Sequence, residues 1–237
     1  MTTDRVETIP NTRTLVCFDP EEGACSMLEF RLTYKGPLKA ASAGSGSSNV
    51  RQKHSIRRQF NLQMRELWRQ HPNLRQQSEI LYCRLGGNVI RSSAIDPDAK
   101  SWPEHIADEH ARYGYRFVPL VSKEGGFTCA LDILFLRRDN PGSLLAHGGD
   151  IDNRIKTLLD SLTMPGSTSQ MAGEVPGDNE DPFYCLLEDD SLVTSVSITT
   201  DRLLTPMDAA EKMHDVDLVI HVTVTDPSAL FTGNRLV

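Results

Sequence analysis

The segment 150–162 constrains the fold of this 237-residue chain more than any other segment. Its apolar residues recur at helical spacing and form one stripe, made by Ile155, Leu158, Leu159 and Leu162. Such a stripe predicts an amphipathic helix with one face packed against another layer. Asp150 or Asp152 can cap its start. The rest of the chain must therefore supply an apolar surface for this helix to cover.

Alternating segments before and after this helix predict that surface. In 27–34 the apolar residues alternate with polar ones, which is typical of a half-buried strand. Further strands are predicted at 80–85, 116–121, 127–138, 191–200 and 215–224. A second helix is predicted over 54–70, where His71-Pro72 ends the run. This order predicts an α+β fold with a mixed β-sheet and helices packed mainly on one face.

The length fits one domain with insertions, since domains commonly hold about 100–200 residues. We expect an N-terminal extension over 1–26 and a single domain over 27–237, with insertions near 40–53, 86–115 and 165–182. Segments 40–49 and 164–182, rich in Gly, Ser or Pro, are predicted to be mobile loops. No apolar run approaches the about 20 residues of a membrane span, and the start lacks a signal-peptide pattern. We therefore expect no membrane association and a cytoplasmic location.

The charge is unevenly distributed. The net charge is -7 overall, but Lys and Arg exceed Asp and Glu by 6 over 51–138, and acidic residues exceed basic ones by 12 over 139–237. A negative total argues against nucleic-acid binding, whereas such polarity fits a polyanion-binding face beside an acidic site. The candidate DNA contacts are Lys35, Lys39, Arg51, Lys53, Arg57, Arg58, Arg65 and Arg69. The alternative is a solvated basic helix face.

Two acidic motifs suggest a metal site. Asp150 and Asp152 stand at the start of the predicted helix, and Asp189 and Asp190 directly precede a predicted strand. Because both pairs lie at ends of core elements, we expect the carboxylates to converge. Carboxylates that lie close together need a cation if they are to stay ionised together. All-oxygen ligation selects Mg²⁺, with Mn²⁺ as a substitute. The alternative is that one motif is a helix cap and the other a solvated turn.

The same helix carries a lysine at a useful position. Lys156 lies one turn after Asp152, with Asp160 one turn further on, so the three share one edge of the helix. Metal ions at such a site activate water and stabilise the leaving oxygen of a phosphodiester. Lys156 would offset charge that builds up in the transition state. The pattern therefore favours phosphoryl chemistry.

These residues resemble the RusA-like Holliday junction resolvases, a family of small Mg²⁺-dependent endodeoxyribonucleases. That family carries D-x-D-N-x-x-K-x-x-x-D-x-L, then an apolar lead into D-D and a strand. Residues 150–162 fill the first part without a gap, and 183–190 fill the second. The resemblance covers about residues 148–202. The chain departs from the family in its greater length and in Ala146-His147-Gly148-Gly149, which replaces a basic run.

The resemblance implies a homodimeric α+β fold with Asp150, Asp152 and Asp190 as metal ligands and Asp189 as a neighbouring carboxylate of the same cluster. It further implies that Lys156 is the catalytic cation and that Asn153 either contacts a metal ligand or caps the helix. Asp160 is the other residue expected to contact the ligands. The function expected is a Mg²⁺-dependent endonuclease that cleaves branched DNA such as Holliday junctions. Two alternatives remain open: a DNA-binding or protein-interaction module with weak or no nuclease activity, and a metal-dependent phosphohydrolase of small nucleotides.

Overall fold

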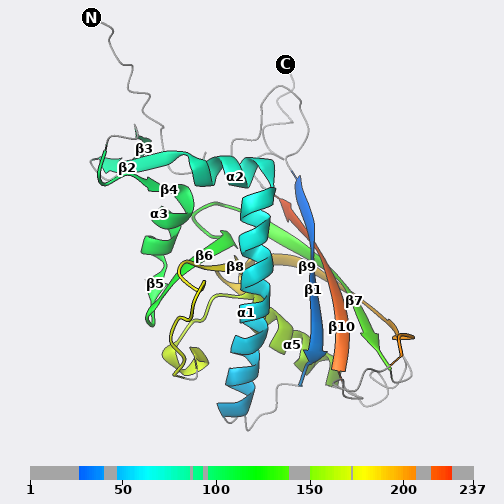
Figure 1. Ribbon diagram of the computed structural model, residues 1–237. Helices are drawn as coiled ribbons and strands as arrows, with labels where there is room; N and C mark the ends of the chain where they lie inside the picture. The colour runs from blue at the N-terminus through cyan, green and yellow to red at the C-terminus, as the bar shows by residue number, and fades with distance from the viewer. Residues whose placement is uncertain are drawn as a thin grey trace, which may run out of the picture.

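The central sheet of the computed structural model has four strands, is mixed and has the order β1-β10-β7-β9; it occupies the right-hand part of Figure 1. β1 (Met27–Pro37), β10 (Asp215–Thr225) and β7 (Thr128–Arg137) are antiparallel neighbours. β9 (Val193–Arg202) pairs with β7 in parallel and forms the edge opposite β1. The structure describes residues 27–39, 47–85, 88–92, 96–138, 150–171, 173–206 and 215–225.

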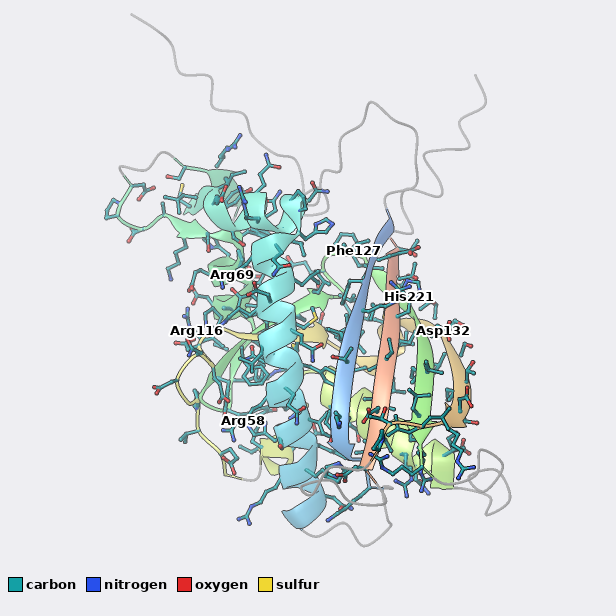
Figure 2. The ribbon with its side chains drawn as sticks, turned by 45° about the vertical axis from the view of Figure 1, so that its right-hand side comes forward. Arg58, Arg69, Arg116, Phe127, Asp132 and His221 are labelled. Atoms are coloured by element: carbon teal, nitrogen blue, oxygen red, sulfur yellow. The ribbon has the colours of Figure 1, made fainter. Side chains whose placement is uncertain are left out.

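Two helices pack on one face of this sheet. α1 (Ser47–Gln70) lies beside β1, and α5 (Asp150–Leu162) packs against α1 (Figure 1). Buried side chains from the helices and from the three antiparallel strands form one core, which includes Leu32, Phe60, Met64, Leu131, Ile133, Leu158, Leu218 and Ile220. Asp132 and His221, which are register partners on β7 and β10, point to the other face (Figure 2). The alternation of apolar and polar residues along each strand sets these two faces.

Two smaller sheets extend the structure on the other side of α1. β6 (Tyr115–Val121) pairs in parallel with β8 (Phe183–Leu187) and antiparallel with β5 (Ala111–Arg112). β2 (Leu81–Leu85) pairs with β3 (Asn88–Arg91) and β4 (Lys100–Ser101). The remaining elements are α2 (Pro72–Glu79), α3 (Trp102–Glu109), η1 (Thr168–Met171) and η2 (Asp190–Leu192).

The predicted α+β class is confirmed, and α5 has the predicted bounds. The loop predicted over 40–49 is wrong in its last part, because α1 begins at Ser47. Ser and Asn are favoured at helix starts as well as in loops, so composition does not separate the two. Segment 86–115 holds three short strands besides its helix. The extension 1–26 lies outside the described residues. Among the described helices, none has the length and apolar character needed to cross a membrane.

Candidate functional site

Asp152 and Lys156 lie on the first two turns of α5, at the end of the sheet where β7 finishes. Both side chains are exposed. The Arg154 guanidinium between them donates a hydrogen bond to the carbonyl oxygen of Leu38, which directly follows β1. β1 finishes at the same end of the sheet at which β10 begins and β7 finishes. Asp150 opens α5, but its side chain lies outside the described residues.

Asp189 and Asp190 lie at the opposite end of β7. The Asp189 carboxylate accepts a hydrogen bond from Lys123 Nζ at 2.8 Å, and Lys123 belongs to the turn that precedes β7. It also accepts one from the backbone N–H of Ser191 at 2.9 Å. Lys123 is the larger cause of a pKa of Asp189 that lies well below its usual range. Asp190 is exposed at the start of η2.

The length of α5 separates the two acidic motifs. Thr163, just after α5, bridges to Leu187, and the N–H of Met164 donates to the Leu187 carbonyl at 2.8 Å. Since a helix rises about 1.5 Å per residue, Asp152 lies about 16 Å along the axis from Thr163. The expected convergence with Asp189 is therefore not found within one chain. Within the part of the chain that the structure describes, no group of three His, Cys, Asp or Glu side chains could hold a metal ion.

The two supporting residues of the motif also differ in their surroundings. Asp160 forms an ion pair with Lys53 at 2.5 Å, which joins α5 to α1. Asn153 is exposed, and its carbonyl accepts a hydrogen bond from the Thr157 hydroxyl at 3.1 Å. Asp160 therefore contributes to helix packing. The same ion pair occupies Lys53, a predicted DNA contact.

Arg57 is buried, and its prediction as a DNA contact is wrong. Its side chain is only 2% exposed. Nε donates to the carbonyl of Thr163 at 3.1 Å, and Nη2 donates to the carbonyl of Asp160 at 2.8 Å. Burial lowers the pKa of Arg57 to about 10, so it stays charged at neutral pH. Arg57 therefore donates hydrogen bonds to carbonyls at the C-terminal end of α5, where a helix leaves its carbonyls without internal partners. Its role is structural.

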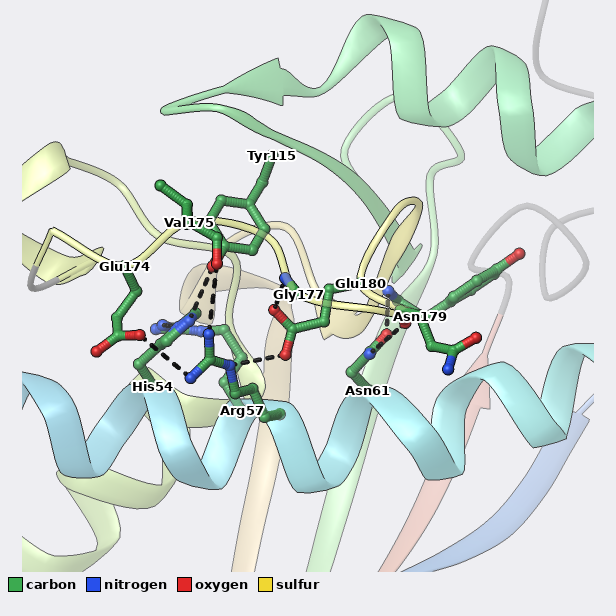
Figure 3. A network of polar contacts seen from close by, with 11 residues as sticks. His54, Arg57, Asn61, Tyr115, Glu174, Val175, Gly177, Asn179 and Glu180 are labelled. Atoms are coloured by element: carbon green, nitrogen blue, oxygen red, sulfur yellow. Dashed lines mark hydrogen bonds and ion pairs between the residues drawn. The ribbon is translucent and has the colours of Figure 1, made fainter.

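The acidic part of segment 164–182 covers the middle of the basic face of α1 (Figure 3). Arg58 forms ion pairs with Glu180 at 2.7 Å and with Glu174 at 3.3 Å. Arg65 donates to the carbonyl of Pro182 and lies over the Tyr184 ring, 5.8 Å from its centroid. This segment, predicted to be a mobile loop, is thus held on α1 by its own charges. Its carboxylates occupy Arg58 in place of a phosphate backbone.

His54, which is buried on α1, lies in the same network. It is 1% exposed, its Nε2 lies 3.2 Å from the Tyr115 hydroxyl, and its ring stacks on Phe183. Burial, followed by the charges of Arg57 and Arg58, lowers the pKa of His54 to about 4. Its ring is therefore neutral at pH 7. The sequence showed this histidine only as one more basic residue of the helix.

Among the predicted DNA contacts, the exposed Lys35, Lys39 and Arg51 lie where β1 ends and α1 begins, and not along the middle of α1. Arg69, far along the helix, pairs with Glu66 at 3.2 Å (Figure 2). At the start of α1, the Gln52 amide donates to the carbonyl of Pro37, which brings that helix to the end of β1. The exposed basic residues of this region define a cationic end, made by Lys35, Lys39, Arg51, Lys156 and Arg202. Arg202 joins it because β9 ends beside the last residue of β7.

No protein-family model, curated protein or solved structure matches this chain. The spacing of the acidic motifs, the cationic end and the arrangement of α5 and β9 are therefore the observations that bear on its function.

Proposed function

We propose that the protein is a Mg²⁺-dependent endonuclease that cleaves branched DNA, such as Holliday junctions, and that it acts as a homodimer. The observation that supports this most is α5 itself. Residues 150–162 form one unbroken helix, which the D-x-D-N-x-x-K-x-x-x-D-x-L spacing needs in order to align its charged positions. Asp152 and Lys156 are both exposed and lie one turn apart on the same side.

The surroundings of Asp152 suit a phosphodiester substrate. The cationic end provides exposed Lys and Arg side chains around an exposed carboxylate, which is how a polyanion can approach an acidic site. The basic face of α1 is a poorer candidate, since Arg57 is buried and Arg58 is paired with two glutamates. We therefore assign DNA contact chiefly to Lys35, Lys39 and Arg51, with Lys156 at the scissile phosphate.

The carboxylate donor set fits Mg²⁺ in its chemistry. Asp152 and Asp190 are exposed oxygen donors, and Lys123 keeps Asp189 ionised at neutral pH. Mg²⁺ bound by Asp150, Asp152 and Asp190 would supply an activated water and polarise the phosphate. Lys156 would stabilise negative charge on the phosphate oxygens during attack.

The distance between the two motifs makes the homodimer part of the proposal. Within one chain, the length of α5 keeps Asp152 from Asp190. In a two-fold dimer, the cationic end of each copy meets the Asp189-Asp190 end of the other. Each of these two contacts brings both halves of the donor set together. Each dimer then has two sites, as two opposed strands of a junction require.

The central test uses cleavage of a synthetic four-way junction with Mg²⁺. Asp152→Asn is expected to reduce cleavage by more than about 100-fold while junction binding persists, because it removes a metal donor and no phosphate contact. Asp178→Asn, which alters an exposed aspartate of the loop on α1, is the matched control and should keep full activity. Unchanged cleavage by Asp152→Asn overturns the proposal.

Mixing two inactive variants tests the shared site. A heterodimer of Asp152→Asn and Asp190→Asn has one site with both changes and one site with neither, so mixing should restore cleavage to about a quarter of wild type, since half the dimers are mixed and each holds one intact site. If each chain held its own complete site, every site in the mixture would carry one change, and no activity would return.

A DNA-binding module without nuclease activity is the second candidate. It is favoured by the separation of the carboxylates within one chain and by the ion pair that occupies Asp189. Calorimetric titration with Mg²⁺ and Mn²⁺ discriminates between the two. Saturable binding that Asp152→Asn removes supports the nuclease, and junction binding without metal binding supports the module.

A further inference from the structure

We propose that the exposed edge of β9 is the surface through which two copies of the chain associate, in antiparallel pairing about a two-fold axis near the middle of the strand. This inference rests on the proposed function, because it names the contact behind its dimer. β9 has ten residues and lies at the end of the strand order. Eight of the ten are exposed, on both faces of the strand.

The buried row of the sheet continues onto β9 and is left uncovered there. Val196 and Ile198 are the register partners of Leu131 and Ile133 on β7, so the four side chains share the core face. Leu131 and Ile133 are 1% and 0% exposed, whereas Val196 and Ile198 are 38% and 36% exposed. An edge strand also presents unpaired N–H and C=O groups that a second strand can use. A partner strand would continue the sheet and cover this row.

The charges at the two ends of β9 favour a second copy in antiparallel orientation. The strand begins just after Glu188, Asp189 and Asp190, and it ends at Arg202 in the cationic end. Antiparallel pairing sets the acidic end of each copy against the cationic end of the other, and two-fold symmetry makes this contact twice. Parallel pairing would set acid against acid and base against base.

The length of β9 also suits the proposed site. β9 spans β7 from Cys129 to Arg137, the same interval that separates the two acidic motifs. When two such strands pair antiparallel, the start of one lies beside the end of the other. Asp190 of one copy then approaches the end of its partner where α5 begins. The pairing that covers Val196 and Ile198 therefore brings the acidic end of each copy to the end of the sheet at which its partner's α5 begins.

The test measures association by light scattering coupled to size-exclusion chromatography. The wild-type chain should have twice its 26.4 kDa mass. The double variant Val196→Lys/Ile198→Lys should have the mass of one chain, because two lysines at a paired edge repel their counterparts. Both positions are exposed, so circular dichroism should show an unchanged fold. Leu62→Lys, which changes a 60% exposed apolar residue on α1, is the control and should remain dimeric.

A wild-type monomer, a species larger than a dimer, or a double variant that stays dimeric overturns the β9 contact. Hydrogen exchange provides a second measurement: amides of 194–201 should exchange at least about tenfold more slowly in the wild type than in the double variant, and equal rates also overturn it. Cleavage is scored separately. A β9 dimer without Mg²⁺-dependent cleavage refutes the nuclease and leaves the contact standing. A cleaving monomer refutes the contact and the shared-site homodimer, and leaves the nuclease activity standing.

Discussion

The two edge strands of the central sheet, β1 and β9, differ in what lies along their outer sides. At the β1 edge, the N–H of Thr33 donates to Gln63 Oε1 at 2.9 Å, and Gln63 Nε2 donates back to the Thr33 carbonyl at 2.7 Å. A side chain of α1 therefore occupies the edge of β1 in place of a further strand. At the β9 edge, Val196 and Ile198 are exposed on the side that is core elsewhere in the sheet.

This difference follows from where the helices lie. α1 lies beside β1 and contacts it, and its Phe60 and Met64 join the core under β1 and β10. β9 lies beyond β7, at the far side of the sheet from β1. The same sheet thus has a protected edge on one side and an open edge on the other. The closed edge contributes to folding, and the open edge is available for association.

Alanine substitution of two neighbouring isoleucines gives the largest expected difference in stability and tests whether β9 is open. Ile133 and Ile198 are register partners on one face, but only Ile133 is buried. Ile133→Ala should lower the free energy of unfolding by about 3–4 kcal/mol, through lost burial and the cavity left behind. Ile198→Ala should cost less than about 1 kcal/mol in dilute protein. Urea unfolding of both variants measures the difference.

Protein concentration supplies the control for this pair. The cost of Ile198→Ala should grow as concentration rises, because association stabilises the folded chain by mass action. The cost of Ile133→Ala should change little with concentration. Equal costs in dilute protein would mean that β9 is covered within the monomer, and the contrast between the edges would fail.

The fold was most predictable where local pattern and burial agree. α5 has the bounds that its apolar stripe gives, and the alternation in β1, β7 and β10 marks their buried faces. The exposure of β9 was not predictable, since β-branched residues indicate a strand and carry no information about which helix covers it. The position of Asp152 relative to Asp190 depends in the same way on the tertiary course of α5, which spacing alone does not give.

The basic face of α1 shows why charge alone misleads about a site. Arg57 and Arg58 are adjacent and equally basic in the sequence, yet one is buried and the other is paired. The carbonyl groups that hold Arg57 lie 103 and 106 residues later in the chain. No local window contains both partners. The acidic composition of segment 164–182 was the one available signal, since opposite charges in one chain tend to pair.

The contact of α1 with β6 and β8, on the side of α1 away from the open edge, should govern how stability depends on pH. The pKa of His54 is about 4 in the folded protein, below its ordinary 6.5, so the unfolded chain binds the extra proton between these values. Stability is therefore lost as the pH falls through this window, by about 2 kcal/mol from pH 7 to pH 5. His54→Gln should remove this part of the slope in urea unfolding at the two pH values. A variant with the wild-type slope would assign the pH dependence to other groups, and Val196→Lys/Ile198→Lys should retain the wild-type slope.

The smallest expected effect is at the closed edge itself. Gln63→Ala removes both hydrogen bonds to Thr33 and should lower the free energy of unfolding by about 1 kcal/mol, since water can replace them at this exposed position. Gln59→Ala, one turn earlier on α1, is the matched control and should cost less. The mass in solution should not change, because the exposed charges of Arg31 and Lys35 still disfavour pairing at β1. New association by Gln63→Ala would show that one side chain, and not the charges around it, keeps this edge closed.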